Sequence, residues 1–138
     1  MNTYDIDDIE NVREQFQISV TEEMVEMFEK ITGDRNPLHM DAAYAKSKGY
    51  SGKVVYGLLT GSLLSTLCGM YVPGERSLIQ EMDVKFPGPV YTGDTLTITG
   101  TVAEVHKSIR QIVLKVEIVN QNHEKVLRGK MRVGLTDG

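Results

Sequence analysis

Cysteine is nearly absent from the chain, because Cys68 is the only one among 138 residues. A single thiol cannot form an intrachain disulfide or build a cysteine-based metal site. The scarcity fits a reducing compartment, and we expect a cytoplasmic protein. The segment Met1 to Glu10 is too acidic and polar for a secretory signal, and we expect residues 1–11 to be loosely ordered.

The chain also lacks a basic cluster, and its net charge is −4. Proteins that bind nucleic acid usually carry a basic patch, so a nucleic-acid partner is not expected. Hydrophobic residues make up 41% and charged residues 25% of the sequence, which is ordinary for a globular protein. We therefore predict one domain over residues 1–138.

Charged residues are missing altogether from Val54 to Gly74. That length matches a membrane span, but glycine, serine and threonine interrupt the stretch, and Pro73-Gly74 ends it. A helix that is apolar on all sides is more often buried inside a protein. We therefore predict a buried helix over residues 57–71 and no association with a membrane.

The first part of the chain predicts one strand and two helices. Apolar residues alternate with polar ones near residues 12–20, which indicates a strand. Thr21 is a suitable N-cap for a helix over residues 22–32, and a short helix over residues 42–48 ends at Gly49. Four apolar residues of the first helix recur at helical spacing: Met24, Met27, Phe28 and Ile31. The two methionines and Phe28 are predicted to lie in the core.

Beyond Pro73-Gly74 the apolar period changes to two, which predicts four strands. Their apolar faces are Leu78, Met82, Val84 and Phe86, then Leu96, Ile98 and Val102, then Ile112, Leu114, Val116 and Ile118, and finally Leu127, Met131, Val133 and Leu135. Consecutive strands with short connections are usually antiparallel neighbours. Each apolar face needs a cover, so the pattern predicts an α+β fold with an antiparallel sheet wrapped around the central helix.

The segment from Gly33 to Asp41 carries an acid and an imidazole five residues apart, Asp34 and His39. Gly33 is placed to end a helix, and Pro37 disfavours regular helix before it. We therefore predict a stiff loop with two titratable groups, which suits proton transfer. The residues alone leave an alternative open: Asp34 caps a turn, Asn36 initiates another, and His39 has no chemical role.

A metal site is not predicted. His39 and Asp41 have a spacing that permits ligation, but the sequence offers no convergent third ligand. His106 and His123 fall near strand ends or turns, and we expect both on the surface.

Several strings resemble the MaoC-like dehydratases and (R)-specific enoyl-CoA hydratases, a family with the hot-dog fold. The resemblance spans about residues 12–135, and its most specific part is the hydratase motif. The matching strings are Gly33-Asp34-Arg35-Asn36-Pro37-Leu38-His39-Met40-Asp41-Ala42, Tyr56-Gly57-Leu58-Leu59, Ser62-Leu63-Leu64-Ser65, Val84-Lys85-Phe86-Pro87 and Val90-Tyr91-Thr92-Gly93-Asp94.

The resemblance implies reversible hydration of trans-2-enoyl thioesters to (R)-3-hydroxyacyl thioesters. By the motif, Asp34 and His39 would hold and activate water, and the Gly57 backbone N–H would donate to the thioester carbonyl. Asn36 would shape the loop, and Ser65 would support the site. The resemblance further implies no cofactor, a coenzyme A or acyl carrier protein thioester as substrate, and a homodimer or higher oligomer with sites at the interface.

One position departs from the family pattern, because Tyr56 stands where members commonly have histidine before the glycine that opens the helix. Two other functions stay open: a hot-dog thioesterase and a non-catalytic protein that binds acyl thioesters. The motif argues against the thioesterase, and the presence of both Asp34 and His39 argues against a non-catalytic protein. Gly57 has an alternative role as a plain N-cap, and Ser65 as a small packing residue.

Overall fold

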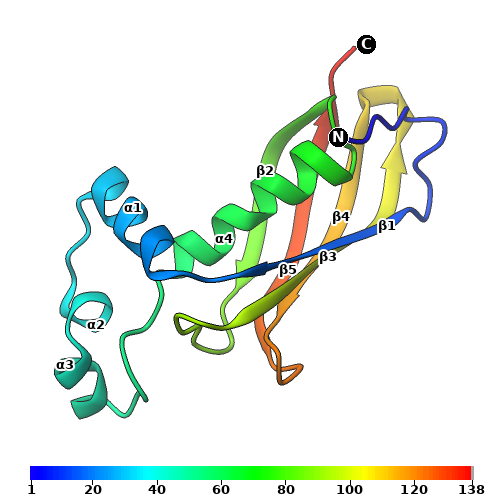
Figure 1. The fold of residues 1–138 in the computed structure, drawn as a ribbon. Coiled ribbons are helices and arrows are strands. Elements are labelled where there is room, and N and C mark those ends of the chain that lie inside the picture. The colour runs from blue at the N-terminus through cyan, green and yellow to red at the C-terminus, as the bar shows by residue number, and fades with distance from the viewer. Residues whose placement is uncertain (138) are drawn as a thin grey trace.

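The computed structural model describes residues 1–137. Five antiparallel strands form one sheet in the order β1-β3-β4-β5-β2, and the sheet curves around helix α4 (Figure 1). The strands are β1 (Arg13–Ser19), β2 (Ser77–Lys85), β3 (Thr95–His106), β4 (Gln111–Val119) and β5 (Lys125–Leu135). The helical elements are α1 (Glu22–Thr32), α2 (Pro37–Met40), α3 (Ala42–Ser47), α4 (Gly57–Thr66), the π-helix η1 (Leu67–Tyr71) and the 3₁₀ turn η2 (Lys107–Ile109). The predicted α+β architecture is confirmed.

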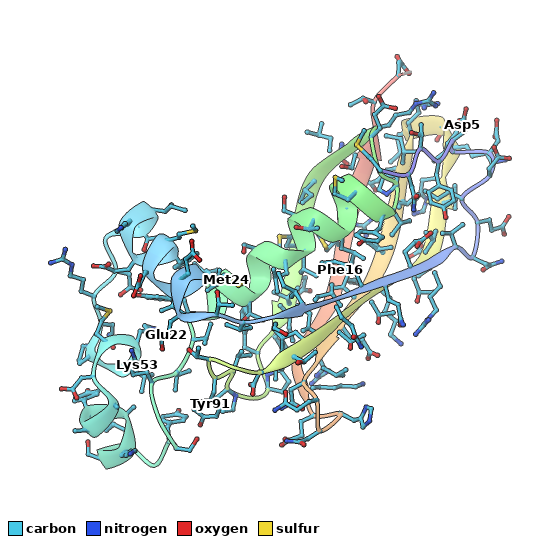
Figure 2. The ribbon with its side chains drawn as sticks, viewed as in Figure 1. Asp5, Phe16, Glu22, Met24, Lys53 and Tyr91 are labelled. Carbon is cyan, nitrogen blue, oxygen red and sulfur yellow. The ribbon has the colours of Figure 1, made fainter. Side chains whose placement is uncertain are left out.

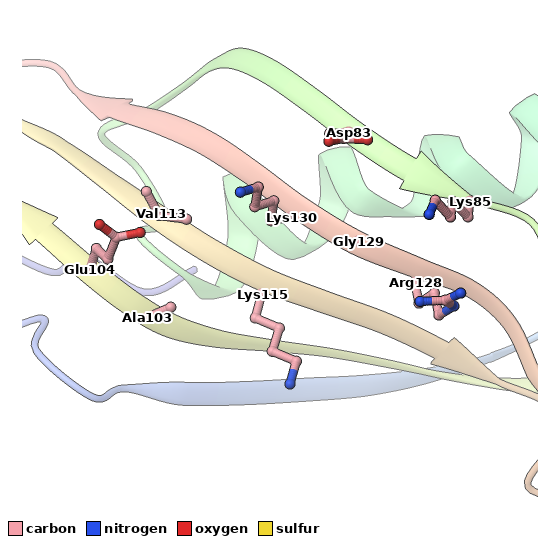
Figure 3. Close-up of a pocket in the computed structure, with 9 residues that line it drawn as sticks. All are labelled: Asp83, Lys85, Ala103, Glu104, Val113, Lys115, Arg128, Gly129 and Lys130. Carbon is pink, nitrogen blue, oxygen red and sulfur yellow. The ribbon is translucent and has the colours of Figure 1, made fainter.

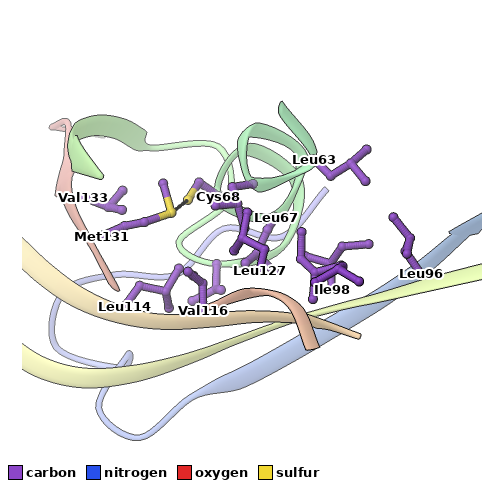
Figure 4. Close-up of a cluster of buried hydrophobic side chains, with 14 of the residues drawn as sticks. Leu63, Leu67, Cys68, Leu96, Ile98, Leu114, Val116, Leu127, Met131 and Val133 are labelled. Atoms are coloured by element: carbon purple, nitrogen blue, oxygen red, sulfur yellow. Dashed lines mark hydrogen bonds between the residues drawn. The ribbon is translucent and has the colours of Figure 1, made fainter. Parts of the chain in front are cut away.

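The core lies between α4–η1 and the concave face of the sheet (Figure 4). Leu64, Leu67 and Cys68 are fully buried there. The Cys68 thiol donates to the Met131 sulfur at 3.9 Å, and burial raises the pKa of this thiol to about 12. The thiolate is the reactive form of cysteine, so Cys68 is an inert packing group in the native protein.

The charge-free helix has the predicted extent, since α4 and η1 together run from Gly57 to Tyr71. Its last five residues adopt π-helical hydrogen bonding. None of the helices in residues 1–137 is long and apolar enough to cross a bilayer.

Local signals placed the first helices correctly. Thr21 caps α1 by accepting from the Met24 N–H at 3.2 Å, and Gly33 ends α1 in the left-handed region with φ 71°. Asp41 caps α3 by accepting from the Tyr44 N–H at 3.1 Å. These side chains bind the N–H groups that a helix start leaves without partners.

The predicted order of the late strands is wrong in one respect, because β2 pairs with β5 and not with β3. An irregularity between Ile79 and Glu81 also shifts the register of β2. Ile79 lies opposite the buried Val133, whereas Leu78 lies opposite Gly134. Directly opposed residues share a face, so Ile79, and not Leu78, is on the same face as Met82.

The apolar stripe of α1 was also predicted incorrectly. Val25 is the buried residue of this helix, whereas Met27 is exposed and Ile31 is 81% exposed. The helical period was correct, but α1 lies beyond the end of the sheet (Figure 1).

Residues 20–56, which we name the helical lobe, contain α1 to α3 and project beyond the end of the sheet where α4 begins (Figure 1). Both ends of the lobe bind the linker over residues 86–94. The Gly93 N–H donates to the Val20 carbonyl at 2.8 Å, and the Val55 N–H donates to the Val90 carbonyl at 2.8 Å. Figure 2 shows Glu22 and Lys53 facing each other near these ends, where their charged groups lie 3.5 Å apart.

The first eleven residues differ from the expected loose order. The Asn2 N–H donates to the Met70 carbonyl at 2.9 Å, and Thr3 forms a β-bridge with Gly74. Ile6 and Ile9 are buried in the core. The acidic composition of this segment did not indicate the packing, because the packing depends on only two apolar residues, Ile6 and Ile9.

The close approach of η1 to β3 makes Gly100 a sensitive position. A Cβ at Gly100 would lie 2.9 Å from Leu67 Cδ2, so Gly100→Ala is expected to lower the free energy of unfolding by about 1–3 kcal/mol through overpacking. Gly52→Ala is the matched control, because its Cβ would meet no atom within 4 Å, and it should lose less than about 0.5 kcal/mol. Urea unfolding measures both, and equal losses would contradict this account of the contact.

Candidate functional site

The Asp34–His39 segment is more regular than predicted. Asp34 Oδ1 accepts from the Asn36 N–H at 3.0 Å, and Asn36 Oδ1 accepts from the Leu38 N–H at 3.0 Å. Pro37 then begins the one-turn helix α2, which contains His39. Proline is favoured at a first helical position because its φ is already helical. The prediction of a loop without regular helix is therefore wrong for residues 37–40, while the capping turns of the alternative, at Asp34 and Asn36, are present.

The imidazole of His39 is held in one tautomer. Its Nδ1 lies 2.6 Å from the Val54 carbonyl oxygen. A carbonyl oxygen can only accept, so Nδ1 carries the proton in this bond. In the neutral ring Nε2 is then unprotonated and has a free lone pair.

Tyr56 connects the two parts of this segment. Its side chain is only 2% exposed, and its hydroxyl donates to the Asp34 carbonyl oxygen at 2.6 Å. Its ring centroid lies 4.3 Å from that of His39 and 4.8 Å from that of Phe28. Burial, and then the nearby Asp34 and Glu29 carboxylates, raise the pKa of the Tyr56 hydroxyl above its ordinary value, so the hydroxyl remains a donor at neutral pH.

The start of α4 presents free donors beside these groups. Tyr56 is the N-cap residue, but its side chain makes no capping bond. Within residues 1–137, the N–H groups of Gly57 and Leu58 donate to no protein acceptor. A helix N-terminus carries partial positive charge and favours an anionic ligand atom. The Phe86 ring borders this point, since it lies 3.6 Å from where a Gly57 Cβ would be.

A pocket of about 330 Å³ joins these elements. It brings together Asp34, His39 and Gly57, three of the five residues singled out in the sequence. Asn36 caps α2 beside the pocket, and Ser65 lies exposed further along α4, so neither lines it. The lining residues are Phe28, Thr32, Asp34, His39, Tyr56, Gly57, Leu58 and Phe86.

The apolar wall of this pocket was not predicted from the sequence. The pattern of apolar residues indicated a core position for Phe28 and a place on the apolar face of a strand for Phe86. The useful signal for Phe86 was its position, because it directly precedes the Pro87 that ends the strand and shares the face that covers the central helix. No signal identified Leu58, since one apolar residue in a charge-free run has no distinguishing feature.

A second concavity, of about 370 Å³, lies on the sheet face opposite α4 (Figure 3). Its polar groups are four cations and two carboxylates: Lys85, Lys115, Arg128, Lys130, Asp83 and Glu104. It has no imidazole and no helix terminus. In residues 1–137 no group of three histidine, cysteine, aspartate or glutamate side chains is arranged to hold a metal. The pocket at the start of α4 is therefore the candidate active site.

Comparisons with known proteins identify the family and the fold of the chain. The model of the MaoC like domain family matches residues 7–125. An (R)-specific enoyl-CoA hydratase from Aeromonas caviae is 31% identical over 111 residues, which cover 80% of this chain and 83% of the relative. A mitochondrial 3-hydroxyacyl-acyl-carrier-protein dehydratase from Solanum lycopersicum is 40% identical over 86 residues, 62% of this chain and 48% of that protein. The structure of an unliganded R-hydratase from Pseudomonas aeruginosa superposes with a TM-score of 0.88 at 25% identity, covering 96% of this chain and 86% of that one.

The tautomer of His39 can be measured directly. Because Nδ1 donates to the Val54 carbonyl, ¹⁵N NMR of the neutral imidazole is expected to show Nδ1 protonated and Nε2 with the shift of an unprotonated nitrogen. His106 is the internal reference: its Nε2 lies 3.4 Å from a Glu104 oxygen, so the opposite tautomer is expected there. An Nε2-protonated His39 would contradict the assigned geometry.

Proposed function

We propose that this chain, which belongs to the MaoC-like domain family, catalyses reversible addition of water to a trans-2-enoyl thioester, giving an (R)-3-hydroxyacyl thioester. Its five-stranded sheet around α4 is the hot-dog fold that the sequence resemblance implied. One observation carries the proposal: a single pocket is lined by Asp34, His39 and Gly57, the first residue of α4. These groups can hold a water, accept its proton and stabilise the developing negative charge, which are the tasks that hydration needs.

Water activation is assigned to Asp34 and His39. The Val54 carbonyl fixes His39 with Nε2 free to accept a proton from water. One Asp34 oxygen is occupied by the Asn36 N–H, which leaves the other to hold the same water. The water oxygen forms a bond to Cβ, and the proton that His39 takes from the water is delivered to Cα, so the atoms of one water are added and nothing else is consumed.

Activation of the substrate is assigned to the start of α4. Attack at Cβ moves negative charge onto the thioester oxygen as an enolate. A free backbone N–H at a helix N-terminus stabilises such charge by hydrogen bonding and by the helix dipole. Gly57 has no side chain, so the thioester can approach this N–H closely.

The proposed chemistry needs no metal or redox cofactor, because proton transfer and one oxyanion donor are sufficient. The thioester carrier is coenzyme A or acyl carrier protein, and the proposed setting is the cytoplasm. Asn36 holds the motif in shape by capping α2. The supporting role of Ser65 remains a prediction, since in the single chain this residue lies outside the pocket.

We further propose that the chain acts as a homodimer that pairs through β2. Unprotected edge strands readily pair with another chain. The β1 edge carries mainly charged and amide side chains, whereas β2 exposes Leu78, Ile79 and Met82. Leu58, beside the pocket, is 73% exposed. A second copy on this side would cover apolar residues that the single chain leaves in water.

Substitution of the catalytic pair tests the reaction. Asp34→Asn and His39→Ala are each expected to lower hydration of crotonyl-CoA at least ~100-fold, the usual scale for loss of a general acid or base. Loss of enoyl absorbance measures hydration, and thiol release is followed in parallel. An (R)-specific 3-hydroxyacyl-CoA dehydrogenase identifies the product enantiomer.

Two matched variants control for the loss of any carboxylate near the motif and for the loss of any histidine. Asp41→Asn keeps an N-cap on α3 and changes a carboxylate outside the pocket, and His106→Ala removes an imidazole on the far part of β3. Both should retain near-normal turnover. Thiol release without hydration would identify a thioesterase, and no reaction with enoyl thioesters of any length or carrier would leave a binding protein.

Disruption of the β2 edge tests the assembly. Met82→Lys is expected to shift the protein from dimer to monomer in light scattering at micromolar concentration, because it places a charge in the proposed seam. Ile109→Lys is the control, since Ile109 is a similarly exposed apolar residue, 64% against 43% for Met82, on the η2 turn. A monomeric wild type with full hydratase activity would refute the proposed dimer.

A further inference from the structure

We propose that Tyr56 is the positioning residue of this site and holds the Asp34 carboxylate and the His39 imidazole in one fixed relation. The inference rests on the proposed hydratase function. It concerns a position where the family commonly has histidine, and it gives the tyrosine hydroxyl and the tyrosine ring separate tasks.

The hydroxyl fixes the main chain at Asp34. Within residues 1–137, the other hydrogen bonds of Asp34 are local, to Thr32 Oγ1 and to the Asn36 N–H. The bond from the Tyr56 hydroxyl to the Asp34 carbonyl, at 2.6 Å, is the one that reaches another part of the fold. Asp34 is otherwise exposed. The position of its carboxylate relative to α4 therefore depends on this hydroxyl.

The ring limits the motion of His39. The Cβ–Cγ bond and the bond from Nδ1 to the Val54 carbonyl hold the imidazole at two neighbouring ring atoms, which still allows the Nε2 side of the ring to tilt about the line between them. The Tyr56 ring lies against the imidazole with centroids 4.3 Å apart and planes 32° apart. Phe28 packs against Tyr56 at 4.8 Å and prevents it from moving away.

The two tasks matter because one water has to meet both groups. General acid and base groups act at hydrogen-bond distance, and a displacement of about 1 Å is enough to cost much of the rate. Tyr56 also directly precedes Gly57, the proposed oxyanion donor. The buried Tyr56 side chain therefore fixes the His39 imidazole and the Asp34 carboxylate in position relative to the Gly57 N–H.

Two substitutions separate the tasks. Tyr56→Phe keeps the ring and removes the hydroxyl, and is expected to lower kcat about tenfold, the scale of one ordinary hydrogen bond, with KM within about twofold. Tyr56→Leu removes both functions and is expected to lower kcat about a hundredfold. In Tyr56→Leu, and not in Tyr56→Phe, the ¹⁵N signals of His39 should lose their single-tautomer pattern.

Tyr4→Phe is the matched control. The Tyr4 hydroxyl also makes one hydrogen bond of 2.6 Å, to Glu14, and Tyr4 is partly buried far from the pocket. It should lower the melting temperature without changing kcat. Equal losses of kcat in Tyr4→Phe and Tyr56→Phe would show that the effect is general destabilisation and would overturn the assignment.

A double-mutant cycle tests whether the hydroxyl acts through Asp34. If it positions the carboxylate, Tyr56→Phe should have little further effect in an Asp34→Asn background, because the group it positions is already lost. Amide exchange over residues 33–36 should accelerate in Tyr56→Phe and stay unchanged in Tyr4→Phe. Additive losses of kcat, or unchanged exchange, would overturn the inference. An inactive wild type would instead reject the proposed function, and the exchange measurement would still decide whether Tyr56 fixes this segment.

Discussion

The structure depends first on burial of one charge-free helix by the sheet. Leu64, Leu67 and Cys68 have no exposed surface. The sheet backbone at Gly100 lies so close to Leu67 that a Cβ at this position would be too near its side chain. Such burial is the dominant favourable contribution to folding. It also fixes the direction of α4, so that the first turn of the helix emerges at the end of the sheet, beside the helical lobe (Figure 1).

The chemistry follows from this placement. A helix start has donors without partners, and here the N-cap residue leaves Gly57 and Leu58 unsatisfied and uses its hydroxyl to bind the Asp34 carbonyl. The Val54 carbonyl, two residues earlier, orients the imidazole. Residues 54–56, which lie directly before the helix, therefore position the His39 imidazole and the Gly57 N–H. The turns at Asp34 and Asn36 position the Asp34 carboxylate.

The sequence predicted what short-range rules control. Thr21, Gly33 and Asp41 marked helix ends, and the motif placed Asp34 and His39 together. Strand order and the shift at Ile79 were not predictable, since pairing of β2 with β5 depends on contacts more than forty residues apart in the chain. Period alone also misplaced Met27, because an apolar stripe indicates that a helix has a buried side and does not show which of its residues are covered. The apolar wall at Phe86 depended on the same long-range information.

The lobe begins and ends on the same short linker, at Val20 and at Val55. In topological terms it is a closed loop attached at its base, and its interior contributes no strand to the sheet. Insertions, deletions or replacements between these two anchor points leave the register of all five strands intact, because loop length adds little to the cost of closure. The part of the molecule that carries the acid and the base can therefore diverge at its own rate, while the sheet and the start of α4 remain a constant frame.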